Sequence, residues 1–264
     1  MALEAWWPRY LEIVARFGYS IEEDQRAADL LSDILDGQTI RLSCISNLVT
    51  DKNVLIFGAG PSLPRNLEEI IKNNIAQGAT LISADGATTA LLEQDLQPDL
   101  VVTDLDGTVP DILQAHQDGS IVLVHAHGDN TSSLEHYVPI LLHDQVEGNG
   151  VLGSTQARPR PGVINTGGFT DGDRCVFLAE AFRANIIGLV GMDLGVFVGR
   201  YSKPNLSADI LASKTKREKL SVAKTLLEWL ASLSQCKIIN LTGGTTQIPG
   251  IPDQDITEFA WEAQ

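Results

Sequence analysis

Six short apolar runs, each ending in glycine or aspartate, constrain the fold of this chain more than any other feature. The runs are NVLIFGAG, ATLISADG, DLVVTDLDG and SIVLVHAHGD, followed later by NIIGLVGMD and CKIINLTGG. Their length and β-branched content predict buried strands, and segments with helical periodicity lie between most of them. This alternation predicts an α/β fold, with a doubly wound, mostly parallel sheet and helices on both of its faces.

Before the first of these runs, apolar residues recur at three- and four-residue spacing, which predicts helices. These residues are Leu11, Ile13, Val14, Phe17, Leu30, Leu31, Ile34 and Leu35. We expect a helical segment over residues 1–50 that packs but does little chemistry, and an α/β catalytic domain over residues 51–264. The segment from Gly148 to Gly168 is rich in Gly and Pro, which predicts a long loop over the site.

The net charge of −15, from 19 Lys plus Arg against 34 Asp plus Glu, limits the partners of the chain. Such a charge repels phosphate backbones, and without a basic run to overcome this repulsion we expect no nucleic-acid partner. An acidic protein commonly binds an anionic small molecule through a divalent cation or through backbone N–H groups. The carboxylates at the strand ends therefore become candidate metal ligands.

The cysteines and the N-terminus predict the compartment. The three cysteines, Cys44, Cys175 and Cys236, lie far apart without a CxxC pair, so neither a disulfide framework nor a zinc ribbon is expected. The N-terminus lacks the plan of a signal peptide, and no stretch reaches the ~18 apolar residues of a membrane span. We therefore expect a soluble, cytoplasmic protein without a membrane partner.

The stretch TDLDG places Asp104 and Asp106 two residues apart after an apolar run. In an extended strand their side chains share one face, where they repel each other unless a cation lies between them. With Thr108 the stretch also matches the DxDGT signature of haloacid dehalogenase phosphatases, in which the first aspartate is a nucleophile. That signature usually lies on the first core strand, whereas two strands precede it here and no later GDxxxD pair follows. A Mg²⁺ site is favoured, and the phosphatase stays an alternative.

Two earlier motifs are candidates for binding a nucleotide. Glycines in GAGPSL let the backbone approach a phosphate, and Ser62 begins a helix whose N-terminus faces an anion; a tight turn with a serine cap explains the motif equally well. Asp85 in ADGA either receives a ribose or caps the following helix. The candidate residues are Gly58, Gly60, Pro61, Ser62, Asp85 and Gly86.

The stretch HAHGDN carries His125, His127 and Asp129. It is similar to the ligand string of the metallo-β-lactamases, which continues with a histidine where Asn130 stands here, so a zinc hydrolase is the weaker interpretation. Asp129 is instead a candidate third carboxylate beside Asp104 and Asp106. The roles of the two histidines stay open.

The stretch NTGGFTDGDR precedes an amphipathic helix. Thr170 or Asp171 would cap this helix, and Asp173 would lie favourably in its first turn. Paired glycines, an aromatic ring and two acids also suit a flat heterocycle beside a phosphate site. The later GMDLG offers Asp193, for which a packing role and a ligand-binding role are equally supported.

Taken in order, these motifs resemble the archaeal 6-hydroxymethyl-7,8-dihydropterin diphosphokinases of the MptE type, over about Val54 to Leu233. ADGA and TDLDG are also similar to stretches of thiamin pyrophosphokinase, although the chain lacks room for that enzyme's β-sandwich domain. The resemblance implies a Rossmann-like sheet, like the thiamin pyrophosphokinase catalytic domain. It also implies Mg²⁺-dependent transfer of diphosphate from ATP to a reduced pterin, releasing AMP, in methanopterin- or folate-type coenzyme biosynthesis.

The resemblance further implies that Asp104 and Asp106 hold Mg²⁺ and act in catalysis with help from Asp129, and that the glycine-rich motif supports the nucleotide phosphates. We place the pterin, by its chemistry, at Asn165, Phe169, Thr170, Asp171 and Asp173. Besides the phosphatase, two alternatives remain: a thiamin pyrophosphokinase-like enzyme with another acceptor, and a nucleotide-sensing subunit, which would not need the acid cluster. The sequence leaves open the choice between ATP and GTP, the acceptor's side group, the catalytic base and whether the chain forms a homo-oligomer.

Overall fold

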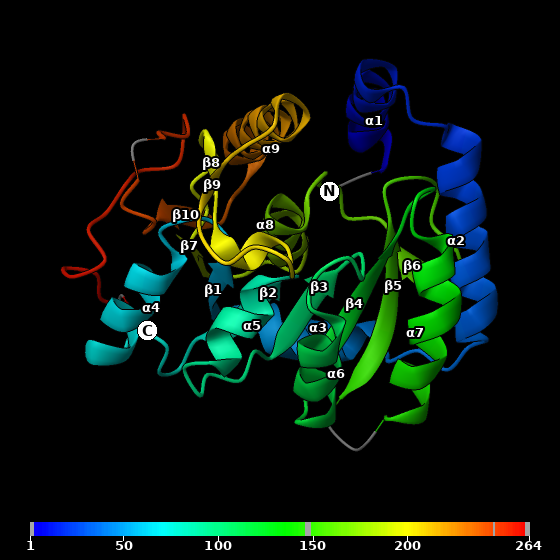
Figure 1. Cartoon of the computed structure of the whole chain (residues 1–264), viewed down its shortest axis with the longest axis horizontal. Helices are drawn as coiled ribbons and strands as arrows, with labels where there is room; N and C mark the ends of the chain where they lie inside the picture. The colour runs from blue at the N-terminus through cyan, green and yellow to red at the C-terminus, as the bar shows by residue number, and fades with distance from the viewer. Residues whose placement is uncertain (1–2, 146–148, 245, 262–264) are drawn as a thin grey trace.

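A computed structural model describes residues 3–145, 149–244 and 246–261 of the chain. Over these residues, eight parallel strands form one sheet in the order β10-β7-β1-β2-β3-β4-β5-β6, with helices on both faces (Figure 1). The strands are β1 (Asn53–Phe57), β2 (Thr80–Ala84), β3 (Leu100–Thr103), β4 (Ile121–Ala126), β5 (Gly150–Thr155), β6 (Val163–Ile164), β7 (Ile186–Val190) and β10 (Lys237–Asn240). The predicted α/β class and the six predicted strands are confirmed.

The helices that cover the sheet are α1 (Leu3–Phe17), α2 (Ile21–Leu35), α3 (Leu42–Val49), α4 (Leu63–Lys72), α5 (Ala87–Leu92), α6 (Val109–Gln117), α7 (Thr131–His143), α8 (Asp171–Ala181) and α9 (Lys214–Leu233). Alternate side chains of each strand enter opposite cores, as the period of two requires. In β1, Val54 and Ile56 join the core under α1, α3, α8 and α9, whereas Leu55 and Phe57 join the core under α4 and α5.

The segment from Gly148 to Gly168 does not form the predicted long loop. Gly148 lies outside the described residues, but β5 and β6 pair within the segment, and β5 runs parallel to β4. Gly150 and Gly153 allow close packing rather than a turn: a Cβ on Gly150 would lie 1.8 Å from Ile40, and one on Gly153 would lie 2.9 Å from Leu31. The helical segment therefore rests directly on a strand that looks like a loop in the sequence.

The order of the strands changes direction between β1 and β7. From β1 the chain builds the sheet toward β6, then returns to place β7 on the other side of β1. In open parallel sheets, ligands bind outside the carboxyl ends of the strands at such a switch point. Gly58 and Gly191 directly follow these two strands, and the Gly58 N–H donates to Val190 O.

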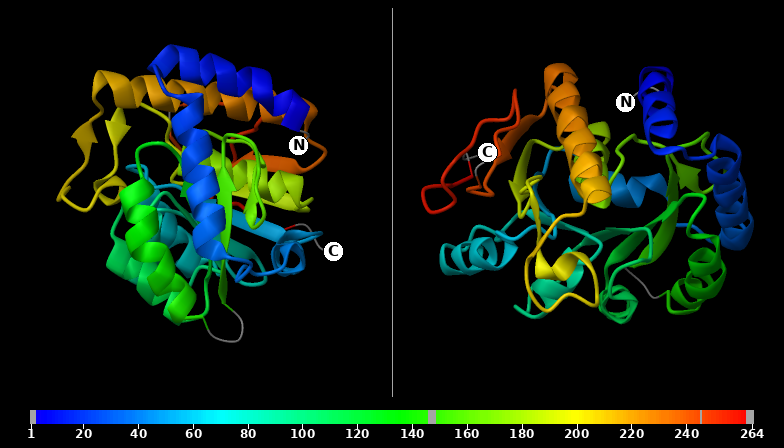
Figure 2. Two further views of the ribbon diagram at one scale, coloured as in Figure 1. Left: turned by 90° about the vertical axis from the view of Figure 1, so that its right-hand side faces the viewer. Right: turned by 45° about the horizontal axis from the view of Figure 1, so that its top comes forward.

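The N-terminal helices pack into the same cores as the sheet. Trp6 and Tyr10 are buried with residues of α8 and β1, and Leu31 is buried with Val101 of β3. Helix α1 lies beside α9 (Figure 2), where the Arg9 guanidinium carbon is 5.2 Å from the centroid of the Trp229 ring. The helices predicted before residue 50 are present, and the division of the chain at that point stays a prediction.

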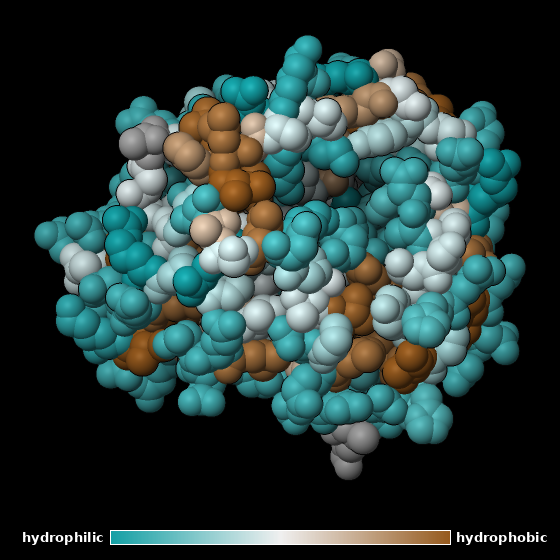
Figure 3. All heavy atoms as spheres, viewed as in Figure 1, coloured by the Kyte–Doolittle hydropathy of each residue, from teal (hydrophilic) through white to brown (hydrophobic). Residues whose placement is uncertain are grey.

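A small antiparallel hairpin, β8 (Phe197–Val198) with β9 (Ile210–Leu211), projects beside the carboxyl ends of the strands. Phe197, Ile210 and Leu211 are exposed on it, and Figure 3 shows an apolar group of side chains at this place. No helix in the described ranges is long and apolar enough to cross a lipid bilayer.

Candidate active site

A cavity of about 400 Å³ opens at the carboxyl ends of the parallel strands. Its wall comes from the residues that follow β1 to β5 and β7, from the first turns of α8 and α9, and from the β8–β9 hairpin. Almost every polar motif that the sequence places at a strand end contributes to this one cavity. Motifs that lie far apart in the sequence therefore form the wall of one cavity.

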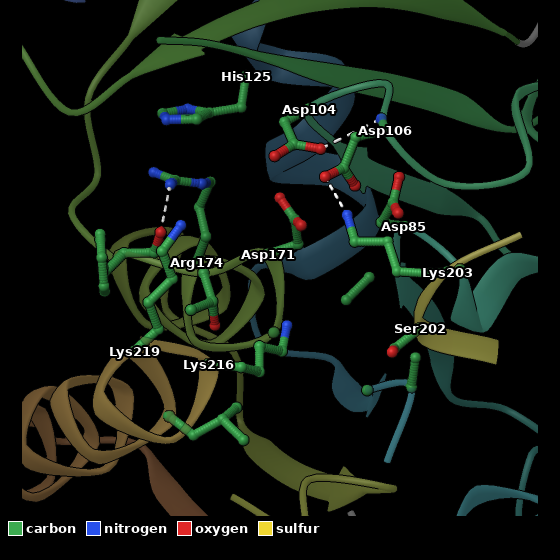
Figure 4. Close-up of a pocket in the computed structure, with 18 of the residues that line it drawn as sticks. Asp85, Asp104, Asp106, His125, Asp171, Arg174, Ser202, Lys203, Lys216 and Lys219 are labelled. Atoms are coloured by element: carbon green, nitrogen blue, oxygen red, sulfur yellow. Dashed lines mark hydrogen bonds and ion pairs between the residues drawn. The ribbon is translucent and has the colours of Figure 1, made fainter. Parts of the chain in front are cut away.

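Three carboxylates meet in the cavity. Asp85, Asp104 and Asp106 each offer one oxygen atom, and the three atoms lie within 4.8 Å of one another (Figure 4). Thr103 Oγ1 donates to Asp85 Oδ1 at 2.5 Å, which fixes the orientation of that carboxylate. A Cβ on Gly107 would lie 2.2 Å from Asp85 Oδ2, so the glycine of TDLDG leaves room for this third acid.

The charges of these carboxylates are strongly coupled. Burial and the neighbouring Asp104 raise the pKa of Asp85 to about 7. Burial also opposes the ionisation of Asp104, but its contacts with His127 and Asp106 and the charge of Lys203 together outweigh burial and lower the pKa of Asp104. Mg²⁺ prefers oxygen ligands, and a bound cation relieves the repulsion between neighbouring carboxylates. The trio therefore fits this cation.

His127 orients Asp104. The Asp129 backbone N–H donates to His127 Nδ1 at 3.2 Å, so the imidazole proton lies on Nε2, which is 3.4 Å from Asp104 Oδ2. Asn130 Nδ2 adds a bond to the Asp104 carbonyl at 2.8 Å. His127 thus lies beside the acids. In the described part of the chain, the cluster of possible metal ligands includes neither His125 nor His127.

Asp129 lines the same cavity but is not a member of the trio. The third carboxylate beside Asp104 and Asp106 is Asp85, which the sequence analysis assigned to the nucleotide. Asp85 reaches the trio because β2 pairs with β3, so that two neighbouring strands end side by side. The role of Asp129 as a metal ligand stays a prediction.

Four cationic side chains face the acids. Lys203 forms an ion pair with Asp106, and Arg174, Lys216 and Lys219 line the opposite wall (Figure 4). Burial opposes the charge of Lys203, but the hydrogen bond and charge of Asp106 raise its pKa. Burial and Lys203 lower the pKa of Lys216. An acid trio facing cations can hold a metal-bound polyphosphate between them.

The sequence analysis missed all four cations. Lys203 lies on the connection between β8 and β9, which follows no strand of the main sheet. The basic stretch KTKREK at the start of α9 is the available clue for Lys216 and Lys219, because basic runs are rare in so acidic a chain. Arg174 is buried in α8, and the sequence around it is typical of a helix that packs against a core.

The residues predicted to bind a nucleotide divide into two groups. Gly58, Gly60, Asp85 and Gly86 line the cavity. Ser62, which follows Pro61, instead donates from its backbone N–H and its Oγ to Asp193 Oδ2, at 3.2 and 2.8 Å. A Cβ on Gly60 would lie 2.0 Å from the same Asp193 oxygen, so GAGPSL and GMDLG fit closely across the switch point. Contact of Pro61 and Ser62 with phosphate stays a prediction.

The residues predicted to bind the pterin also divide. Phe169, Thr170 and Asp171 line the cavity. Asp173 is buried and forms a capping box with Thr170, accepting the Phe169 and Thr170 backbone N–H groups at 2.8 and 2.7 Å. Asn165 Nδ2 donates to Ala157 O at 2.6 Å and so braces the preceding loop. The geometry of these two residues indicates structural roles.

Asp171 differs from its neighbour in the same turn of α8. Its side chain points toward Asp104 and Asp106 (Figure 4), and within the described residues its carboxylate makes no hydrogen bond. Burial and the charges of Asp104 and Asp85 raise its pKa well above the usual range. A cavity carboxyl group with a raised pKa is a candidate proton acceptor.

Comparison with known proteins gives the family. The model of the family described as 6-hydroxymethylpterin diphosphokinase MptE-like matches residues 29–198, which include the carboxylate trio and Asp171. The chain belongs to this family.

Among its curated relatives is the 6-hydroxymethyl-7,8-dihydropterin pyrophosphokinase of Pyrococcus furiosus, 46% identical over 92% of this chain and 100% of the relative. Proteins of the same name from Methanothermobacter thermautotrophicus and Methanocaldococcus jannaschii are 42% and 39% identical, each over 87% of this chain and 95% and 96% of the relatives. The similarity to these relatives thus covers nearly their whole length. The predicted resemblance is confirmed.

A comparison with solved structures supports the fold. The MAf glycosyltransferase from Magnetospirillum magneticum AMB-1 superimposes with a TM-score of 0.53 and 18% sequence identity, covering 87% of this chain and 40% of that one. At this identity the likeness concerns the fold alone. It supports the assignment of an α/β sheet flanked by helices.

Proposed function

We propose that the chain transfers a diphosphate group from ATP to the hydroxymethyl group of 6-hydroxymethyl-7,8-dihydropterin, releasing AMP. Its membership of the MptE-like family supports this activity. The observation that carries the proposal is the trio of Asp85, Asp104 and Asp106, which pairs with Lys203 and faces Lys216 across a cavity at the switch point of the sheet. The product would enter the synthesis of a methanopterin- or folate-type coenzyme.

The two ends of the cavity suit two substrates. The nucleotide lies over Gly58 and Gly60, where the absence of side chains lets phosphates approach backbone N–H groups. Asp85, Asp104 and Asp106 hold Mg²⁺, which when bound would neutralise charge on the phosphate oxygens. Lys203 adds positive charge beside Asp106, and Lys216 and Arg174 add it on the opposite wall. The pterin then lies toward Phe169 and the N-terminal helices.

The reaction is a direct displacement. The pterin hydroxyl oxygen attacks the β-phosphorus of ATP, the bond from that phosphorus to the α-bridging oxygen breaks, and AMP leaves with the bridging oxygen. Asp171 accepts the hydroxyl proton, because it faces the trio without a hydrogen-bond partner in the described structure. The protein supplies position and charge, and no covalent intermediate forms.

The products test the proposal. Incubation with ATP, Mg²⁺ and 6-hydroxymethyl-7,8-dihydropterin should yield AMP and a pterin diphosphate in equal amounts, separated by chromatography. Chelation of the Mg²⁺ should stop the reaction. A phosphatase that uses Asp104 as nucleophile would instead release inorganic phosphate without pterin and form an aspartyl-phosphate. ADP as the main product, or a phosphoenzyme trapped at Asp104, would exclude the diphosphokinase.

A further inference from the structure

One buried side chain in the cavity wall has an unused hydrogen-bond acceptor. Gln156 follows β5, is 4% exposed and lines the cavity. Among the described residues, its Oε1 is one of few buried polar side-chain atoms without a partner. Buried acceptors in native proteins are nearly always satisfied, so the oxygen requires a donor that the chain itself does not supply.

The orientation of this amide is fixed by a carboxylate. Gln156 Nε2 is 2.9 Å from Asp24 Oδ2, and because a carboxylate accepts, the nitrogen must face Asp24 and the oxygen must face away from it. Asp24 is in turn held by Tyr10 Oη and by the Gly128 backbone N–H, each at 2.8 Å. Asp24 is buried and lines the cavity as well. The pair thus presents acceptor atoms in a rigid setting.

The pair lies one short loop away from the carboxylate trio. In that loop His127 contacts Asp104, and the next residue, Gly128, donates to Asp24. Tyr19 and Phe169 also line the cavity, with ring centroids 6.4 Å apart. Aromatic faces beside buried acceptors suit a flat heterocycle that carries N–H donors on one edge.

We propose that Asp24 and Gln156 form the acceptor subsite, in which Gln156 Oε1 accepts an N–H of the 2-amino-4-oxopyrimidine edge of the pterin. This inference rests on the proposed function for the identity of the heterocycle. The edge offers two adjacent donors, from the 2-amino group and N3, and Gln156 Oε1 is the acceptor atom of the pair that has no partner. The hydroxymethyl group at the far end of the ring system then reaches toward the trio. Gln156 is in this way a specificity-determining residue, and Asp24 is a positioning residue.

Two variants separate this role from a structural one. Gln156→Met keeps the length of the side chain but removes the acceptor. Gln156→Glu keeps an acceptor, because a protonated carboxyl group can donate to Asp24 and leave its carbonyl oxygen free. Gln97→Met is the matched control: Gln97 also donates from Nε2, to Ala115 O and Ser120 Oγ, but lies away from the cavity.

The measurement compares kcat/KM for 6-hydroxymethyl-7,8-dihydropterin with that for its analogue lacking the 2-amino group. The wild type and Gln97→Met should prefer the pterin by at least about 10²-fold, since a site built to bind an N–H rejects a ligand without it. Gln156→Met should reduce this preference to within a few-fold at an unchanged KM for ATP, and Gln156→Glu should restore most of it. Equal use of both acceptors by the wild type, or an unchanged preference in Gln156→Met, would overturn the subsite.

Binding separates failure of the subsite from failure of the proposed function. If the wild type forms no pterin diphosphate, the proposed function fails, and equilibrium dialysis of 6-hydroxymethylpterin then tests the subsite alone. Binding to the wild type that is lost in Gln156→Met supports the subsite. Equal binding to both proteins, or no binding to the wild type, contradicts it. If Gln156→Met does not fold, as judged by circular dichroism, the comparison of the two acceptors on the wild type still decides.

Discussion

Three carboxylates whose oxygen atoms lie within 4.8 Å of one another repel each other in the metal-free protein. Lys203 offsets part of this repulsion through its ion pair with Asp106. The repulsion that remains adds to the effect of burial and raises the pKa of Asp85. The pKa values of Asp85 and Asp106 are raised, so the charge of either acid opposes folding while it serves metal binding, whereas the lowered pKa of Asp104 means that its charge stabilises the fold.

Neutralising one acid of the trio should expose this difference. We expect Asp104→Asn and Asp106→Asn each to lower kcat by at least about 10²-fold, because a charge that stabilises the transferring group through a cation is lost. Metal-free Asp106→Asn should melt at or above the temperature of the wild type, because the pKa of Asp106 is raised, whereas Asp104→Asn should melt lower, because the lowered pKa of Asp104 means that its charge stabilises the fold. Asp118→Asn, on an exposed residue after α6, is the control. Near-normal turnover in either trio variant would disprove the metal assignment.

The pH dependence of stability should identify Asp85. Its pKa in the folded protein is about 7 because of burial and Asp104, and in the unfolded chain it is about 3.9. Between these values the folded state binds more protons, so this stabilising contribution is complete below about pH 4 and is lost as the pH rises toward 7. Without Mg²⁺, the free energy of unfolding should fall by up to about 1.4 kcal/mol per pH unit from this group.

Asp85→Asn lacks this titration, while its side chain can still accept the hydrogen bond from Thr103. In denaturant titrations, the difference in the free energy of unfolding between variant and wild type should therefore grow from pH 4 to 7 and level off above. Mg²⁺ should reduce the difference, because the cation favours the ionised carboxylate. Parallel pH curves for the two proteins would show that the folded pKa of Asp85 is not raised.

At the scale of elements, the first turn of α8 combines a cap and a site residue two positions apart. Asp173 turns back to the backbone and closes the capping box with Thr170, whereas Asp171 points into the cavity. The sequence motif FTDGDR contains both, and both acids fit a helix N-terminus. Only the direction of each side chain distinguishes their roles.

Substitutions in this turn should separate stability from catalysis. Asp173→Ala should lower the free energy of unfolding by about 2 kcal/mol, because the cap and its buried donors lose their acceptor. Asp171→Asn should melt within a few degrees of the wild type, yet lose about 10²- to 10⁴-fold in kcat together with the rising limb of the pH–rate profile. A profile unchanged in Asp171→Asn would assign the proton to another acceptor.

The elements that the sequence predicted share one property: their signal is local. The six apolar runs predict β1 to β4, β7 and β10 from residues within each strand. Strand β5 is hidden because Gly150 and Gly153 lower its β-propensity, and the reason for both glycines lies in helix α2 and the residues that follow it, more than a hundred positions away. Long-range packing has no local signature, so this strand looked like a loop.

The same distinction holds for the site. Asp104 and Asp106 are adjacent to a strand and were found, whereas the entry of Asp85 into the trio depends on the pairing of β2 with β3. Lys203 arrives on an irregular connection. Gln156 and Asp24 are 132 positions apart in the sequence and form a hydrogen bond at the end of β5, a strand that the sequence did not predict. Residues that act through tertiary contacts therefore required the structure.

At the scale of the whole molecule, none of the cores formed by the described residues belongs to the N-terminal helices alone. Trp6 and Ile13 share the core of β1 and α8, and Leu31 and Leu35 share the core of β3 and β4. Asp24 of α2 also lines the cavity. The expectation that residues 1–50 pack without contributing to chemistry is at odds with this position, and their independence as a folding unit can be tested directly.

Leu31→Ala provides that test. Leu31 is fully buried against the sheet, and its truncation should lower the free energy of unfolding by about 2–5 kcal/mol. If the shared core makes one cooperative unit, hydrogen exchange should accelerate equally in peptides from α2 and from β4. Leu11→Ala, at a side chain that is 40% exposed, should cost far less. Faster exchange confined to α2, with β4 still protected, would instead show that the N-terminal segment unfolds on its own and that the chain divides near residue 50.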